Sequence, residues 1–200
     1  MPMFRGSVLS SSNTRPSQVL TLESDFVSTA EYSPNGTLLA TGTIRGDIHL
    51  WDIESAKPIA VLSEQGHCSN SAETDIRTIS FSADGLLLAS TICGRDVILW
   101  DMATRTLKHR IETDMATYAI DFSPESGLLV TGSDKSAHIW DITSGAKLCT
   151  LATNMRRVVA VGFTRDADRV LAASDDGGVA VWNISGLCEP GKDVQLGPAS

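Results

Sequence analysis

The 200-residue chain lacks an excess of positive charge, a long apolar run and a cluster of cysteines. With 16 Lys and Arg against 24 Asp and Glu, its net charge is −8 at pH 7, so no broad basic surface can collect phosphates. The apolar runs are short, and the N-terminus lacks the basic-then-apolar order of a secretory signal. We therefore expect an intracellular protein, cytoplasmic or nuclear and not secreted, with no membrane partner and with nucleic acid disfavoured as a ligand.

The four cysteines are far apart in the sequence, at Cys68, Cys93, Cys149 and Cys188. They form no CxxC pair, and no His stands at the spacing that a tetrahedral metal site requires. We expect reduced thiols, no metal and no cofactor. Hydrophobic residues make up 42% of the chain, which is enough for a folded core and excludes a mainly disordered protein.

One stretch, Thr78–Asp101, contains the unit from which the rest of the chain is built. Its apolar residues alternate as in a strand, then form a short solid run, and then resume before a Trp-Asp pair. This pattern predicts three strands. The two segments between them are rich in Ser, Asp, Gly and Arg. Because several of these residues accept positive φ or bond their own backbone, both segments predict tight turns.

The unit occurs four times, and each copy contains a tryptophan near its end, at position 51, 100, 140 or 182. The steps of 49, 40 and 42 residues indicate a repeat, and the long first step contains a polar insertion, Glu64–Thr74, which predicts a loop. A fourth, more polar strand signal follows each of the first three tryptophans and suits an outer edge. Another short strand signal, Val19–Leu22, precedes the first copy and has no unit of its own.

The pairs Trp51-Asp52, Trp100-Asp101 and Trp140-Asp141, each with an aromatic residue and a Ser upstream, make the chain resemble the WD-repeat β-propeller family over about residues 19–185. The resemblance implies an all-β fold of four-stranded antiparallel blades around a central channel. A generic sandwich of short strands would not require Trp at the same place in each copy.

The WD-type repeats are expected over residues 18–185, after a flexible tail at residues 1–17. The four blades are placed at about residues 18–62, 75–111, 115–151 and 156–196. The C-terminal segment, residues 186–200, is the candidate source of the last outer strand, through Val194–Leu196.

In the WD-repeat family, a hydrogen-bonded set of His, Ser or Thr, Asp and Trp often locks a blade, and this chain keeps only part of it. The matching residues are Ser133, Asp134 and Trp140 in the third copy and Ser174, Asp176 and Trp182 in the fourth. The first copy keeps Thr43 and Trp51 but has Arg45 in the Asp position, and the second keeps Trp100. We expect Asp134 and Asp176 to accept hydrogen bonds inside their turns, with a modest gain in blade stability.

The candidate catalytic bases are the four histidines, His49, His67, His109 and His138. His49 and His138 lie two residues before a Trp and alternate with apolar residues, so we expect both on third strands in structural roles. No carboxylate or cysteine stands with them at a convergent spacing. The sequence therefore predicts no catalytic residues. The alternative is a propeller-based hydrolase or ligand-binding enzyme, because propellers host both classes.

Loops at a propeller rim are the candidate binding sites, because recognition residues collect on loops that a rigid scaffold holds. The loops that enter the first strands and the turns before the third strands carry six candidate partner-binding residues: Arg45, Arg77, Arg95, Lys135, Arg156 and Arg157. Acidic residues stand among them: Asp25, Asp75, Asp114 and Asp175. The sequence thus predicts a non-catalytic scaffold for other proteins, as a subunit or fragment of a multiprotein assembly.

Four blades are expected to form an open arc or half of a larger ring, because the resemblance implies a ring of about seven. Val19–Leu22 is an outer-strand signal without a blade, whereas the fourth blade has only Val194–Leu196 for that role. Three arrangements stay open. Two copies could form a ring by exchanging the spare strand, another protein could supply further blades, or the chain could be a piece of a longer propeller.

Overall fold

The computed structural model describes residues 19–22, 25–64, 74–92, 94–113, 115–186 and 194–196, the last three as backbone only. The expected tail (1–17) and the middle of the insertion with His67 lie outside the described residues, as do Cys68, Cys93, Asp114 and Cys188. All regular structure in the described part is β-strand. The all-β expectation is confirmed.

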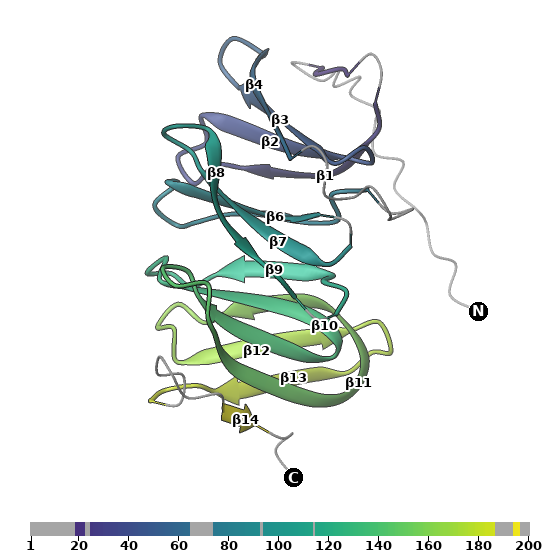
Figure 1. The fold of residues 1–200 in the computed structure, drawn as a ribbon, viewed down its shortest axis with the longest axis vertical. Coiled ribbons are helices and arrows are strands. Elements are labelled where there is room, and N and C mark those ends of the chain that lie inside the picture. The colour runs from purple at the N-terminus through teal and green to yellow at the C-terminus, as the bar shows by residue number, and fades with distance from the viewer. Residues whose placement is uncertain are drawn as a thin grey trace, which may run out of the picture.

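The first two blades are four-stranded antiparallel sheets in which chain neighbours are sheet neighbours (Figure 1). The strands of the first blade are β1 (Val27–Tyr32), β2 (Leu38–Thr43), β3 (Asp47–Asp52) and β4 (Lys57–Ser63). Those of the second are β5 (Ile79–Phe81), β6 (Leu87–Ile92), β7 (Asp96–Asp101) and β8 (Thr106–Ile111).

The third and fourth blades share one continuous set of hydrogen-bonded strands. These strands are β9 (Ala119–Phe122), β10 (Leu128–Asp141), β11 (Lys147–Phe163), β12 (Arg169–Ser174), β13 (Val179–Asn183) and β14 (Val194–Leu196). The first half of β10 pairs with β9 and its second half with β11, so β10 supplies two strands of the third blade. The first half of β11 is the outer strand of that blade, and its second half pairs with β12 in the fourth.

The same hydroxyl chemistry closes the turn after the inner strand of every blade. The side-chain oxygens of Ser33, Ser82, Ser123 and Thr164 each accept the backbone N–H five residues later, at 2.9–3.0 Å. Such local bonds favour turns over continued strands. These four equivalent hydroxyl residues therefore fix four equivalent turns.

The hydrophobic cores lie between neighbouring blades. Trp100 of the second blade packs with Ile48 and Leu50 of the first. Trp140 of the third packs with Leu99 of the second, and Trp182 belongs to the cluster between the third and fourth blades. The second, third and fourth blades thus each turn the tryptophan face toward the preceding blade. The blades follow one another along the molecule, with the first and fourth at opposite ends and the ring not closed (Figure 1).

The tryptophans donate to hydroxyls other than the expected ones. Each of the first three indole N–H groups donates to a buried side chain on the second strand at 2.9 Å: Trp51 to Thr41, Trp100 to Ser90 and Trp140 to Thr131. Ser133, the expected partner of Trp140, lies two residues after the observed acceptor, so this expectation is wrong. Ser133 contacts Ser136 and His138 instead. Residues two apart on a strand share a face, so sequence alone did not separate them.

The fourth blade lacks this bond because Ala172 occupies the position that corresponds to Thr131. The Ser174 Oγ accepts the N–H of Arg157 at 3.3 Å and that of Asp176 at 3.4 Å, so the expectation that it partners Trp182 is wrong. Trp182 itself is buried. Packing, without an indole hydrogen bond to the second strand, therefore holds the tryptophan of this blade.

The two turn aspartates differ from one another. Asp176 accepts the N–H of Gly178 at 3.2 Å inside its turn, as expected, and that of Arg156 at 2.9 Å. The carboxylate of Asp134 instead lies 3.8 Å from Nε of Arg157, in a partly exposed ion pair. The prediction of a turn acceptor is confirmed for Asp176 and wrong for Asp134.

Of the two expectations about outer strands, the one for Val194–Leu196 is wrong, and the one for Val19–Leu22, which needs a second chain or a further blade, stays a prediction. Residues Val19–Leu22 are described but form no strand. The short β14 pairs in parallel with the first half of β11, through Cys149 and Leu151, so it extends the third blade and does not complete the fourth. Among the described strands, β13 has β12 as its only neighbour.

Carboxylates on two inner strands connect neighbouring blades. Glu31 on β1 accepts the N–H of Phe81 on β5 at 3.3 Å, and Asp121 on β9 accepts that of Phe163 on β11 at 3.1 Å. Burial raises the pKa of Glu31 to about 7; the Phe81 N–H opposes this, and the charge of Asp121 adds to it. Burial also raises the pKa of Asp121, against the Phe163 N–H.

The tryptophan bonds predict a stability effect that can be measured in the second blade. Ser90 is fully buried, so Ser90→Ala leaves the Trp100 N–H without its acceptor. We expect a loss of about 1–3 kcal/mol in the free energy of unfolding, measured by urea denaturation. The exposed Ser63→Ala on β4 is the control and should change little; equal losses in the two variants would show that the indole bond contributes nothing.

The pKa of Glu31 predicts a dependence of stability on pH. Because the folded-state pKa of about 7 lies above the ordinary 4.5, the contribution of Glu31 to stability is fully present below pH 4.5 and is lost as the pH rises through 7. Glu31→Gln keeps an acceptor for Phe81 but cannot ionise. The fall in unfolding free energy between about pH 5 and about pH 8 should therefore be smaller in Glu31→Gln than in the parent.

The exposed Glu54→Gln serves as the control for this comparison. It removes the same charge away from the inner strands and should leave the pH dependence of the parent protein unchanged. An identical pH profile in Glu31→Gln and the parent would contradict the assignment.

Candidate interaction surface

The entry loops and the turns before the third strands meet at one rim, as the sequence predicted. The N–H of Ile76, ahead of β5, donates to the carbonyl of Thr43 at the end of β2, at 2.9 Å. The N–H of Thr117, ahead of β9, donates to the carbonyl of Gly94 in the β6–β7 turn, at 3.0 Å. Each of these bonds joins an entry loop to a turn of the preceding blade, so side chains from neighbouring blades form a continuous surface.

An aromatic ring between two arginines occupies this rim. Tyr118 lies just before β9, and the guanidinium carbon of Arg157 is 4.6 Å from its ring centroid. The guanidinium of Arg77, which lies just before β5, is 5.5 Å from the same centroid. The three residues belong to three consecutive blades. Cation–π contacts at exposed sites contribute only about 0.5–1 kcal/mol each, but they hold planar groups in a fixed relation.

Aspartates balance the charge of this arginine–tyrosine cluster. Asp75 lies 3.5 Å from Nε of Arg77, and Asp134 and Asp175 each lie 3.8 Å from nitrogens of Arg157. Ion pairs at these distances and exposures are weak, about 0–1 kcal/mol. The side chain of Arg157 is 40% exposed, so its guanidinium can exchange these contacts for a carboxylate of a partner at modest cost.

The other basic residues that the sequence singled out lie outside the cluster. Arg45 is exposed in the β2–β3 turn, with Nε 3.9 Å from Asp25. Arg95 is exposed in the β6–β7 turn, and Lys135 is exposed in the bend of β10 with φ of 61°. Arg156 is exposed on β11, beside Asp176. Of the six predicted residues, the structure therefore brings Arg77 and Arg157 together around one ring.

Tyr118 was missed by the sequence analysis, although a signal for it exists. It stands four residues before Phe122, as Arg77 stands four before Phe81. Aligning the entry loops on the aromatic residue of the inner strand would have placed both side chains at the same position of successive repeats. Tyr118 is uncharged, so the prediction of basic rim residues does not include it.

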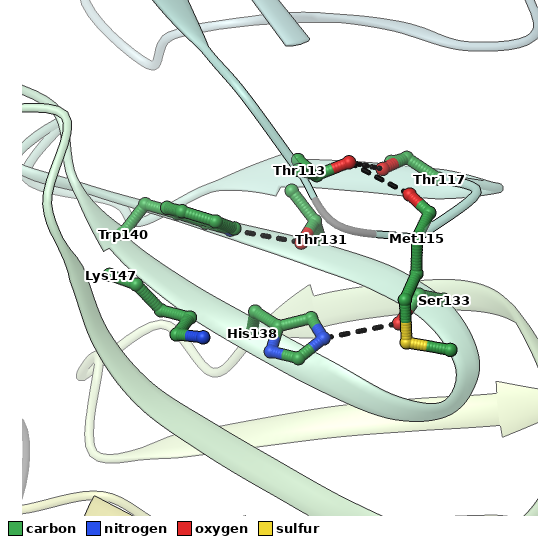
Figure 2. Close-up of a pocket in the computed structure, with 8 residues that line it drawn as sticks. All are labelled: Thr113, Met115, Thr117, Thr131, Ser133, His138, Trp140 and Lys147. Carbon is green, nitrogen blue, oxygen red and sulfur yellow. Dashed lines mark hydrogen bonds between the residues drawn. The ribbon is translucent and has the colours of Figure 1, made fainter. Parts of the chain in front are cut away.

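A second cluster, on the third blade, contains a serine and a histidine in contact (Figure 2). His138 Nε2 lies 3.2 Å from the Ser133 Oγ and 3.0 Å from the Ser136 Oγ. Its Nδ1 lies 3.3 Å from the hydroxyl of Thr150, where a hydrolase would place a carboxylate to stabilise the imidazolium. The adjoining pocket, which Met115 and Trp140 also line, holds only about 50 Å³. This geometry suits a satisfied polar network more than a nucleophile.

The other described histidines, His49 and His109, lie against structural residues. His49 lies beside Trp51 on β3, with ring centroids 6.3 Å apart, and His109 lies against Gly145 of the third blade. Within the described ranges, no three His, Cys, Asp or Glu residues are grouped so that they could hold a metal ion. The same ranges contain no helix with the length and apolar character of a membrane span.

Comparison with known proteins relates this chain to one family and to two larger proteins. The β-propeller family described as "Nucleolar protein 10-like, N-terminal domain" matches residues 7–139. Protein tipD of Dictyostelium discoideum is 33% identical over 67 residues, which are 33% of this chain and 11% of that protein. Periodic tryptophan protein 2 of Arabidopsis thaliana is 34% identical over 77 residues, 38% of this chain and 8% of that protein. The chain spans about a tenth of the length of these relatives.

Proposed function

Because the chain belongs to the family of Nucleolar protein 10-like N-terminal β-propeller domains, with repeats of the WD type, we propose that it is a non-catalytic scaffold that binds other proteins in a nucleolar assembly. The observation that carries the proposal is the cluster of Arg77, Tyr118 and Arg157 at the rim. The family description, which names a nucleolar protein, supports the location.

The composition of this cluster suits protein recognition. Tyr and Arg are enriched among the residues that dominate binding energy at interfaces, because both present large planar groups at a small entropic cost. Tyr118 and Arg157 are partly buried and attached to inner strands, so their positions are held before a partner arrives. The surrounding basic residues, Arg45, Arg95, Lys135 and Arg156, would form the exposed edge of the interface.

The alternation of charges at the rim favours a protein partner over a nucleic acid. Each cluster arginine faces at least one aspartate, so the rim offers paired charges and not a uniformly positive field. A protein segment that carries both acidic and apolar side chains can pair with Arg157 and lie on Tyr118. The net charge of −8 supports the same choice.

Substitutions at the rim test this proposal. We expect the double variant Arg77→Glu/Arg157→Glu to reduce capture of nuclear proteins at least about tenfold, because it inverts the charge on both sides of Tyr118. The matched control is Arg165→Glu/Arg169→Glu, which makes the same charge change at exposed residues around the turn between β11 and β12, at the other end of the strands. Capture is measured by quantitative mass spectrometry of pull-downs from nuclear lysate.

Two further measurements make the result decisive. Circular dichroism and melting of both double variants should match the parent protein. Nuclease treatment of the lysate should leave capture unchanged. Equal capture by the two double variants, or loss of capture after nuclease treatment, would contradict a protein-binding rim.

A further inference from the structure

The rim opposite the arginine–tyrosine cluster contains a groove between the second and third blades. The β5–β6 and β7–β8 turns form one side of it, and the third blade forms the other. The groove holds about 420 Å³, and ligand sites in proteins typically hold about 300–1,000 Å³. Its lining includes Asp84, Leu86, Leu87, Asp101, Lys108 and Ile142.

Smaller residues stand at this boundary than at the boundary between the first and second blades. Arg105, at the end of the β7–β8 turn, reaches the first blade and donates to the carbonyl of Ile59 at 3.1 Å. The equivalent position of the third blade is Gly145, which has no side chain to reach back in this way. Pro34, whose side chain lies against the second blade, is likewise matched by the smaller Ala83.

Leu86 gives the groove an apolar wall, and its side chain is 61% exposed. Leu87 and Ile142, which also line the groove, are buried. At the position of Leu86, the other three blades have polar residues or glycine: Thr37, Gly127 and Asp168. The groove thus has an apolar surface that the same turn does not offer in the other blades.

Two aspartates of the lining are held in fixed positions by their own turns. Oδ1 of Asp84 accepts the hydroxyl of Ser82 at 2.6 Å and the N–H of Leu86 at 2.9 Å. Oδ1 of Asp101 accepts two backbone N–H groups of its turn, each at 2.9 Å. The Ser82 hydroxyl lowers the pKa of Asp84, and the Thr104 N–H lowers the pKa of Asp101, so both are ionised at neutral pH. These bonds use one oxygen of each carboxylate, which leaves the second for a donor of a ligand.

The charges at the groove favour a cationic ligand. Lys108 lines the groove with the two aspartates, so these three residues together carry a net charge of −1. Glu125 and Asp141 stand directly before two further lining residues of the third blade. Arg105 is directed away, to the first blade. An anion would therefore enter a negative field, whereas a cation would be attracted by it.

We propose that this groove binds a segment of a partner protein in which a Lys or Arg side chain stands next to a Leu, Ile or Val side chain. The apolar side chain packs on Leu86 and Ile142, and the cation pairs with Asp84 and Asp101. Arg suits these carboxylates best, because its planar guanidinium presents several donors in a fixed geometry. The groove and the arginine–tyrosine cluster lie at opposite ends of the same strands, so the scaffold can hold two partners at once.

Binding of a defined peptide to the full 200-residue chain tests the proposal. The probe is acetyl-Leu-Arg-Leu-Arg-amide, and its control is acetyl-Leu-Glu-Leu-Glu-amide. In an NMR titration of the isotope-labelled protein, the arginine peptide should shift the backbone amide resonances of Leu86, Ala103 and Ile142. The glutamate peptide should shift none of them at the same concentration.

Asparagine substitutions separate the charge of the groove from the geometry of its turns. Asn35 of the first blade stands at the position of Asp84 and accepts its own turn serine at 2.7 Å. Asn183 of the fourth blade stands at the position of Asp101 and accepts a turn N–H at 2.9 Å. Asp84→Asn/Asp101→Asn therefore keeps both turns and should raise the Kd of the arginine peptide about fivefold, because two ion pairs are lost.

The matched control for charge is Asp52→Asn/Asp166→Asn, which makes the same change at the same two turn positions of the first and fourth blades. It should leave the Kd unchanged. For the apolar contact, Leu86→Thr copies the residue of the first blade and should raise the Kd about fivefold. Its control is Leu107→Thr, at a leucine that is 42% exposed on β8 but does not line the groove.

The rim variant Arg77→Glu/Arg157→Glu should bind the arginine peptide as the parent protein does. Loss of binding in this variant would place the peptide at the other rim and overturn the proposal. Equal binding of the two peptides, no shift at the groove, or equal effects of Asp84→Asn/Asp101→Asn and its control would each overturn it as well. None of these outcomes depends on the pull-downs that test the arginine–tyrosine cluster.

Discussion

The packing of each sheet against its neighbour is the constraint on which the rest of this structure depends, because a four-stranded sheet has two faces and covers neither by itself. Burying one Val, Leu or Ile side chain contributes about 1.5–3 kcal/mol, whereas a net hydrogen bond contributes about 0.5–1.5 kcal/mol. The buried Val, Leu and Ile side chains between the blades therefore contribute more to the free energy of folding than the tryptophan–hydroxyl bonds. This balance explains why the fourth blade persists with Ala172 in place of a hydroxyl. Stability in such an array resides mainly at the contacts between blades.

The same packing brings together the titratable and rim side chains of different blades. Glu31 and Asp121 come from blades that are not adjacent in the chain, yet their charges interact because the inner strands are packed side by side. The rim cluster likewise takes one residue from each of three blades. No single repeat contains either site. A change in the packing of one blade would therefore alter binding and titration as well as stability.

Much of the fold could be predicted because its signals are local and repeated. The turn hydroxyls, the alternation of apolar residues and the recurring tryptophan each act within a few residues, so they identified strands, turns and period. Two of the six candidate rim residues, Arg77 and Arg157, proved to share a cluster. Tyr118 was missed because its role comes from the charges of neighbouring blades. Thr131 was missed because Ser133 has the same chemistry and points to the same face of the strand.

The sequence by itself determined the all-β class, the number of repeats and the order of strands within most blades, since each follows from residues close together in the chain. Only the tertiary structure decided which strand β14 extends, which hydroxyl each indole meets and which side chains share the rim. Those outcomes depend on register and on contacts between blades. A pattern of period two fits more than one register, and packing selects among them.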